Sequence, residues 1–225
     1  MFQNNLMMSA ASISSAANVT LASYTQSGNN ALRTVYTFSD QALGDAAADR
    51  KIVVITAAGS ASAAVSSITI AGVSAALVVD IGTNETNSEM WQADVPTGTS
   101  GDIVVTYGSA IHNTGIGTFR ITGAGTGPSA PSDTATDYDS DPIELTITVP
   151  KDGVCIAGAC DDSSSTHTWA ELTEVYDQSA SGGSRMHTGA LLNSETLQTD
   201  LAVTCTFSNQ TGSQRTGVAA SWAPA

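Results

Sequence analysis

The stretch Ile52–Ala58 reads IVVITAA, and about a hundred residues later Val154–Ala159 reads VCIAGA. Both stretches are short, apolar and rich in β-branched or small side chains, which favours buried strands. Three further pairs of segments follow in the same order, at offsets of 96, 98 and 100 residues: Ser88–Met90 with Ser184–Met186, Asp102–Thr106 with Asp200–Thr204, and Gly117–Phe119 with Gly217–Ala219. This spacing predicts two tandem copies of one compact β unit. Generic β-strand composition is the alternative explanation.

Other short segments of strand-like composition, separated by Gly, Pro, Asn and Asp, continue the pattern and show no helical periodicity between them. They predict an all-β protein, an antiparallel β-sandwich or jelly-roll with two similar tandem halves. The expected strands are Thr34–Phe38, Lys51–Ala57, Ser67–Ile70, Ala76–Ile81, Glu89–Val95, Asp102–Tyr107 and Thr118–Thr122, then Ile143–Val149, Gly153–Ala159, Thr168–Val175, Arg185–Leu192, Leu201–Ser208 and Thr216–Trp222.

Changes in composition suggest how the chain is divided. We expect an N-terminal arm at 1–30, a first half at 31–126, a Pro- and Asp-rich linker at 127–140 and a second half at 141–225. The apolar residues of the arm do not alternate with polar residues as those of a β-sandwich strand do. We therefore expect them to lie outside the sandwich and to contact a neighbouring subunit or a particle. These residues are Phe2, Leu6, Met7 and Met8. A disordered tail is the alternative.

The charge balance excludes several partners. The 225 residues include 7 basic and 21 acidic side chains, which gives a net charge of −14. Nucleic acids and anionic membranes are bound through Lys and Arg, so we expect neither as a partner. No apolar stretch approaches the roughly 20 residues that span a bilayer. Met1–Ala17 contains no Lys or Arg, which argues against a signal peptide.

Residues that often carry chemistry occur here without the spacing that chemistry needs. Cys155, Cys160 and Cys205 do not make a disulfide framework and are expected to be buried thiols. Asp137, Asp139 and Asp141 alternate like the first ligands of a calcium loop, but Pro142 replaces the required Gly, and Thr148 the required Glu. A solvated acidic linker is the preferred interpretation, and a loose cation site is the alternative. Asp161 and Asp162 form a second acidic turn.

Enzymatic motifs are missing from the sequence. His112, His167 and His187 have no metal-ligand spacing, and the nucleophile motif G-x-S-x-G does not occur. The glycine-rich segment Gly98–Gly101 has no Lys and no following helix, unlike a phosphate loop. We therefore expect no enzyme activity, cofactor or metal. Three tryptophans, Trp91, Trp169 and Trp222, are expected in the core, with exposed sugar-binding positions as the alternative.

A resemblance to a known group of proteins rests on strand and turn segments. They are Met1–Met8, Tyr36–Ser39, Ala42–Gly44, Ala48–Val54, Ile68–Val73, Trp91, Pro96–Val105, Trp169, Leu172–Glu174 and Ala220–Pro224. Those after the opening lie within 31–225 and are similar to a β-sandwich module of structural proteins of tailed-bacteriophage virions. The opening itself looks like the start of many such proteins. None of these segments carries catalytic residues.

The resemblance implies a virion component made in the host bacterial cytoplasm, in agreement with cysteines that form no disulfide framework. A capsid decoration or cement protein that bridges neighbouring capsomers fits a small, acidic, β-rich chain with an arm. By analogy with such proteins we expect self-association, as a homotrimer, and contact with other virion proteins such as the major capsid protein. The alternative is a tail or appendage component that binds host surface carbohydrate.

Overall fold

The computed structural model describes residues 15–26, 32–58, 64–82, 86–125, 133–138, 140–163, 165–179, 186–208 and 214–225. All regular structure within these ranges is β-strand, and the strand pairs are antiparallel, which confirms the predicted fold class at this level. None of the described residues belongs to a helix that could cross a membrane. The predicted contact residues Phe2, Leu6, Met7 and Met8 lie outside the described ranges.

The N-terminal half contains two sheets. The first inner sheet has the order β1-β9-β3-β7-β6, formed by β1 (Asn18–Gln26), β9 (Thr114–Thr122), β3 (Lys51–Ala58), β7 (Asn87–Asp94) and β6 (Ala76–Gly82). The first outer sheet has the order β2-β8-β4-β5, formed by β2 (Arg33–Ala42), β8 (Ser100–Ile111), β4 (Val65–Ile70) and β5 (Val73–Ser74).

The C-terminal half also contains two sheets. The second inner sheet has the order β10-β17-β12-β15-β14, formed by β10 (Asp133–Tyr138), β17 (Arg215–Trp222), β12 (Val154–Asp161), β15 (Met186–Asn193) and β14 (Thr173–Ser179). The second outer sheet has the order β11-β16-β13, formed by β11 (Ile143–Val149), β16 (Gln198–Phe207) and β13 (His167–Ala170).

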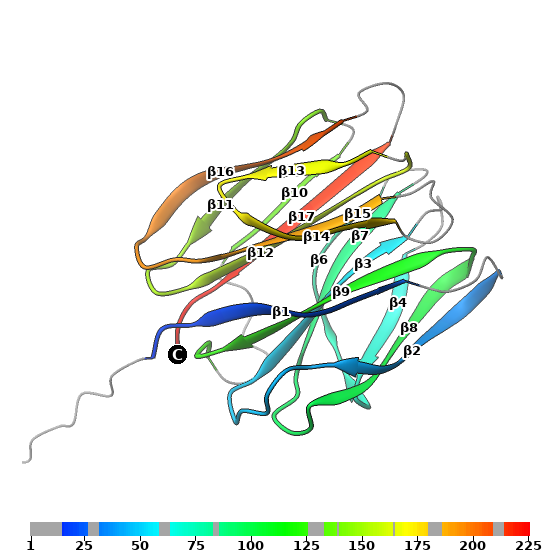
Figure 1. Ribbon diagram of the computed structural model, residues 1–225, viewed down its shortest axis with the longest axis horizontal. Coiled ribbons are helices and arrows are strands. Elements are labelled where there is room, and N and C mark those ends of the chain that lie inside the picture. Colours follow the sequence, from blue (N-terminus) through cyan, green and yellow to red (C-terminus); the bar gives the residue numbers. More distant parts are fainter. Residues whose placement is uncertain are drawn as a thin grey trace, which may run out of the picture.

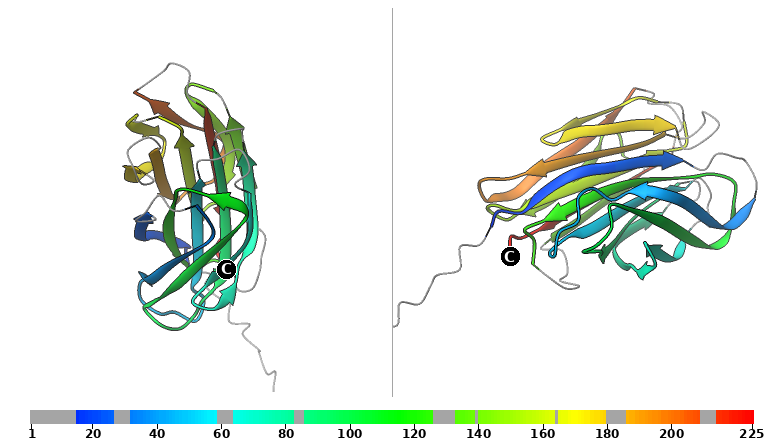
Figure 2. Two further views of the ribbon diagram at one scale, coloured as in Figure 1. Left: turned by 90° about the vertical axis from the view of Figure 1, so that its right-hand side faces the viewer. Right: turned by 60° about the horizontal axis from the view of Figure 1, so that its bottom comes forward.

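Three hydrophobic cores separate the four sheets. One core lies between the first outer and first inner sheets, and another lies between the second inner and second outer sheets. The third lies between the two inner sheets, with Val53, Ile55 and Phe119 on one side and Ile156, Val218 and Trp222 on the other. The layers therefore run outer, inner, inner, outer. In Figures 1 and 2 the C-terminal half, yellow-green to red, lies alongside the N-terminal half, blue to green.

The central strands of the inner sheets are apolar without alternation because both of their faces are covered. Strands β3 and β12 are buried along their whole length. Successive residues of β3 serve different cores: Ile52 and Val54 face the outer sheet, while Val53 and Ile55 face the other half. Strand β11 of an outer sheet instead alternates buried and more exposed residues, since only one of its faces is covered.

Hydrogen bonds also join the two halves. The Trp222 indole Nε1 donates to Gln92 Oε1 at 2.9 Å, and the Ser88 and Thr216 hydroxyl groups lie 2.8 Å apart. At one end of the molecule Ala17 N donates to Asp152 O at 2.8 Å, and Ala225 N donates to Gly123 O at 2.8 Å. The C-terminus therefore lies near the start of β1, as Figure 2 shows.

The predicted N-terminal arm is wrong for part of its range. Residues 18–26 form β1, which pairs with β9 from Asn18↔Thr122 to Gln26↔Gly115. Val19 is 1% exposed, and Ala17 and Val19 belong to the core between the halves. The apolar residues at the start of β1 alternate, but they lie in a stretch rich in Ser, Ala and Thr. The composition of that stretch did not distinguish a strand from a disordered tail.

Two other predicted segments differ from the structure. Residues 133–138, assigned to the linker 127–140, form β10 and pair with β17. The single strand expected at 168–175 is two strands, because Glu171 adopts a φ of 69° between β13 and β14. That turn sends β13 into the outer sheet and β14 into the inner sheet. No Gly or Pro marks the break between β13 and β14.

Candidate functional site

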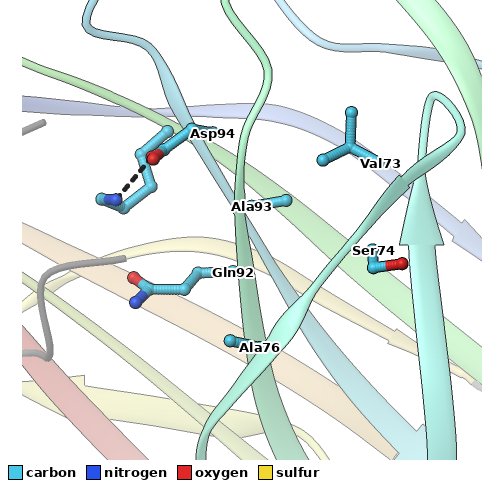
Figure 3. A pocket seen from close by; sticks show the side chains of 7 residues that line it. Val73, Ser74, Ala76, Gln92, Ala93 and Asp94 are labelled. Carbon is cyan, nitrogen blue, oxygen red and sulfur yellow. Dashed lines mark hydrogen bonds and ion pairs between the residues drawn. The ribbon is translucent and has the colours of Figure 1, made fainter. Parts of the chain in front are cut away.

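A hollow of about 200 Å³ lies where β6 separates from β7 (Figure 3). Strand β6 first pairs with β7 at Ala76↔Gln92, whereas the preceding strand β5 belongs to the outer sheet. Beyond Gln92, the described residues include no strand that pairs with this side of β7 at Ala93 and Asp94. The hollow occupies this position and is lined by Lys51, Val73, Ser74, Ala76, Gln92, Ala93 and Asp94.

An ion pair and an amide form the polar side of this hollow. Lys51 Nζ lies 2.6 Å from Asp94 Oδ1, with 2% of the lysine side chain and 40% of the aspartate side chain exposed. Gln92 lies next to this pair, and its Oε1 accepts the hydrogen bond from Trp222 Nε1. The lysine charge is therefore held inside, while the carboxylate that neutralises it faces the opening.

The other side of the hollow is mainly aliphatic. Successive side chains of β7 point to opposite faces, so Figure 3 shows Gln92 and Asp94 on one side of the strand and Ala93 on the other. Val73 and Ser74 of β5 lie on the Ala93 side. Val73 is 40% exposed, which leaves apolar surface at the rim. The hollow thus offers hydrogen-bonding groups on one wall and methyl groups on the other.

A second polar cluster is buried in the C-terminal half. His167 Nδ1 lies 2.7 Å from Asp177 Oδ1, and His167 N donates to Asp177 Oδ2 at 2.9 Å. Burial opposes ionisation of Asp177, but the side-chain and backbone hydrogen bonds from His167 outweigh it and lower its pKa. His167 Nε2 lies 4.0 Å from Asp161 Oδ1, and neither atom has a hydrogen-bond partner among the described residues.

This cluster lacks the contacts of a nucleophilic site. The hydroxyl groups of Ser163 and Ser165 both donate to Asp161 Oδ2. A serine nucleophile would instead need its hydroxyl group beside the histidine ring. Asp161 and His167 also have fully buried side chains, so a substrate has no access to them in this structure. The described contacts therefore support a structural role at the end of β12 and the start of β13.

Aromatic residues close the core between the two halves. The Tyr176 hydroxyl lies 3.0 Å from His187 Nε2, and the Tyr176 ring stacks on Tyr24 with centroids 4.7 Å apart. Burial lowers the pKa of His187 to about 3, with the nearby His167 also contributing. The imidazole is therefore neutral at ordinary pH. Gly117 and Gly189 leave the space that the Tyr176 ring fills.

Glu89 is a buried carboxyl group in the first half. Its Oε1 accepts from Val65 N at 2.6 Å, and its Oε2 accepts from Trp91 Nε1 at 2.9 Å. Burial raises the pKa of Glu89, while these two hydrogen bonds act in the opposite direction. Oε1 therefore joins β7 to the start of β4, and Oε2 fixes the Trp91 indole of the same strand, which supports a structural role for this residue.

Tryptophan and cysteine are placed as the sequence predicts. The three tryptophans are 2–8% exposed, and each indole N–H has an acceptor: Glu89 for Trp91, Thr188 for Trp169 and Gln92 for Trp222. Cys155, Cys160 and Cys205 are buried and form no disulfide. Burial raises the pKa of Cys155 to about 12, which makes it an unreactive thiol.

The acidic segment near β10 has a different role from the predicted solvated linker. Asp133 Oδ2 accepts from Thr148 N, and Asp137 Oδ2 accepts from Glu144 N, both at 2.7 Å. These bonds tie the edge strand β10 to β11 of the outer sheet. Asp141 Oδ2 forms an ion pair with Arg215 Nη1 at 3.3 Å. Asp139 lies outside the described residues. In the described part of the chain, no group of three His, Cys, Asp or Glu side chains could hold a metal ion.

Comparison with known proteins identifies no relative. No family model, no curated protein and no solved structure matches the chain.

Proposed function

We propose that the chain is a non-enzymatic structural protein of a tailed-phage particle, built as two tandem jelly-roll halves. The observation that carries the proposal is the strand order. An eight-stranded jelly-roll alternates its strands between two sheets through two Greek keys. In the first half the orders β1-β9-β3-β7 and β2-β8-β4-β5 follow this scheme, with β6 added at one edge. The second half has β10-β17-β12-β15 and β11-β16-β13, with β14 in the place of β6.

The sequence repeat supports a duplication of one half. Three of its four pairs of segments fall on described strands: β3 and β12, β8 and β16, and β9 and β17. In the fourth pair, Ser88–Met90 lies in β7, and Met186 is the one described residue of its partner segment and begins β15. In each pair the two strands occupy equivalent places in their sheets. An accidental likeness of composition would not be expected to respect the strand order in all three of the fully described pairs.

Jelly-rolls occur in viral capsid and lectin domains, and the fold by itself does not choose between them. The capsid role is favoured here by how the polar residues are used. Arg50, 1% exposed, binds four backbone carbonyl groups, those of Leu43, Gly44, Val95 and Thr97. Glu89, Asp133 and Asp137 likewise bind backbone N–H groups. Side chains used in this way stiffen loops and strand edges, as suits a protein that works by contact.

Within this proposal the chain is a capsid decoration or cement protein. It would associate with itself, as a trimer, and would bridge neighbouring capsomers of the major capsid protein. The predicted contact residues Phe2, Leu6, Met7 and Met8 would supply part of that contact, at about 1.5–3 kcal/mol per buried large side chain before ordering costs. The virion is then its location.

The experiment is a heat and osmotic challenge of particles that lack this chain. A cement role predicts that these particles lose DNA at lower temperature than complete particles, and that added purified protein restores their resistance. Particles that keep full resistance without the chain would overturn the decoration role. If such particles also fail to adsorb to cells, the role is receptor binding.

A second candidate is an appendage that binds host surface carbohydrate. The three tryptophans are buried, so none of them offers a stacking surface for a sugar. The hollow beside β7 is the observation that favours it, because its polar and aliphatic walls suit a sugar ring.

A further inference from the structure

The position of Lys51 is the starting point. The chain contains two lysines, Lys51 and Lys151, and one of them is almost fully buried at the hollow. Burying an ion pair seldom adds stability, because the loss of hydration offsets the attraction between the charges. An apolar pair would serve packing equally well there. Stability alone therefore does not explain the ion pair between Lys51 and Asp94, whereas a binding role would.

The charges in the hollow define the ligand that it would accept. Lys51 and Asp94 neutralise each other at 2.6 Å, so an added anion or cation would gain little from either. An anion would also meet the 40% exposed carboxylate of Asp94 and a protein of net charge −14. A neutral ligand with hydroxyl groups can instead donate hydrogen bonds to that carboxylate, and bonds to charged groups are the stronger ones.

The volume of the hollow and its aliphatic wall further restrict the class of ligand that it can accept. Pockets for drug-sized ligands have volumes of roughly 300–1,000 Å³, so a hollow of about 200 Å³ suits one small ring. Ala93 and Val73 present methyl groups, which can pack against the C–H groups of a sugar ring. The Ser74 hydroxyl lies on the same side and can bind a ring hydroxyl.

We propose that this hollow is a binding site for a neutral saccharide, with one sugar ring held between Asp94 and the aliphatic wall formed by Ala93 and Val73. Asp94 accepts hydrogen bonds from the sugar, and Lys51 holds the carboxylate in place. Trp222 fixes the neighbouring Gln92 amide by donating to its Oε1. This site deepens the second candidate function, but sugar binding can be measured whether or not the chain belongs to a particle.

The test is saturation-transfer difference NMR on the purified chain with free glucose, galactose, mannose, rhamnose and N-acetylglucosamine. At least one should bind with a dissociation constant of about 1–10 mM, as expected for a ligand of few atoms. The acid counterpart glucuronate should bind at least tenfold more weakly than glucose if glucose is the ligand. An equal affinity for glucuronate would overturn the charge argument.

Two variants test the position of the site. Asp94→Asn removes the charged acceptor and should weaken binding at least tenfold. Ser74→Trp fills the hollow from the exposed strand β5, leaves the ion pair intact and should abolish binding. Asp80→Asn is the matched control, since it makes the same charge change at an exposed position of β6 and should bind like the original protein. The proposal fails if no sugar in the panel binds, or if binding survives Ser74→Trp in a folded protein. The number of copies of the chain in purified particles does not depend on whether it binds a sugar. Membership in the particle is therefore tested independently of sugar binding.

Discussion

Gly117 of β9 lies against the Tyr176 ring of β14, across the contact between the halves. A Cβ atom added there would lie 2.6 Å from Cε1 and Cζ of Tyr176, closer than side-chain carbons approach one another. The ring cannot easily move away, because it also stacks on Tyr24, lies against Gly189 and is hydrogen-bonded to His187. The change Gly117→Ala should therefore push the second inner sheet away from the first.

The expected loss can be worked from these contacts. Overpacking a core costs about 1–3 kcal/mol, and losing the hydrogen bond between Tyr176 and His187 adds about 0.5–1.5 kcal/mol. We expect Gly117→Ala to lower the free energy of unfolding by about 2–4 kcal/mol. For a chain of this length that corresponds to a fall in Tm of about 5–15 °C. Urea unfolding followed by tryptophan fluorescence measures the first quantity, and calorimetry measures the second.

A control and a rescue make the test specific. In Gly108→Ala the added Cβ atom would meet only Ala64 O at 3.6 Å, an ordinary contact, so stability should be unchanged or rise by up to about 1 kcal/mol. In a Tyr176→Leu background the Gly117→Ala change should cost less than about 1 kcal/mol, since the ring that it strikes is gone. Equal losses for Gly117→Ala and Gly108→Ala, or full additivity with Tyr176→Leu, would refute this account of the contact between the halves.

Three other predictions concern buried charge and the N-terminal residues. Glu89→Gln should lower the free energy of unfolding by about 1–2 kcal/mol in urea titrations, because one of the two accepting oxygens becomes an NH2 group, which cannot accept from Val65 N or Trp91 Nε1; an unchanged midpoint would show that the lost bond is dispensable. The pKa of His187 is lowered to about 3, so stability should fall as pH drops from about 6.5 towards 3, with a slope of up to about 1.4 kcal/mol per pH unit. His187→Gln should flatten that slope whereas the exposed His112→Gln should not, and identical pH profiles for the two variants would rule out this origin. Deleting residues 1–14 should leave the thermal unfolding of the isolated chain unchanged but weaken its binding to particles lacking the protein, and full binding by the shortened chain would exclude these residues from the contact.

The sequence predicted the strands best where burial makes the pattern unambiguous. The run at 52–58 and its counterpart at 154–159 are apolar at nearly every position because each strand contributes to two cores. In β11 only one face is buried, and the alternation of Ile143, Leu145 and Ile147 with polar residues is equally clear. The antiparallel all-β class follows from such segments and from the turns between them.

The edge strands were harder to predict because their pairing depends on distant residues. Strand β10 reads DTATDY and holds only one small apolar residue on its inner face, so only its pairing with β17 identifies it as a strand. Strand β1 is separated from its partner β9 by about 90 residues of sequence. Neither segment has a local pattern stronger than that of a loop.

The hollow beside β7 could not be predicted from local sequence. It exists because β6 leaves β7 at Ala76, which depends on how the chain crosses from one sheet to the other. Lys51 begins the strand of the first repeat and Asp94 ends its partner strand, so their contact follows from the register of β3 and β7. The sole clue in the sequence was a lysine directly before a fully apolar strand in a chain with two lysines.

The most direct test of the proposed function is the number of copies of this chain in purified phage particles, measured by quantitative mass spectrometry against the major capsid protein. The account predicts that the chain stays with the particles through density-gradient purification at on the order of hundreds of copies, as expected for a protein repeated by capsid symmetry. Its absence from purified particles, with abundant chain in the soluble lysate, would contradict the account. A dozen copies or fewer would contradict the decoration role and favour an appendage.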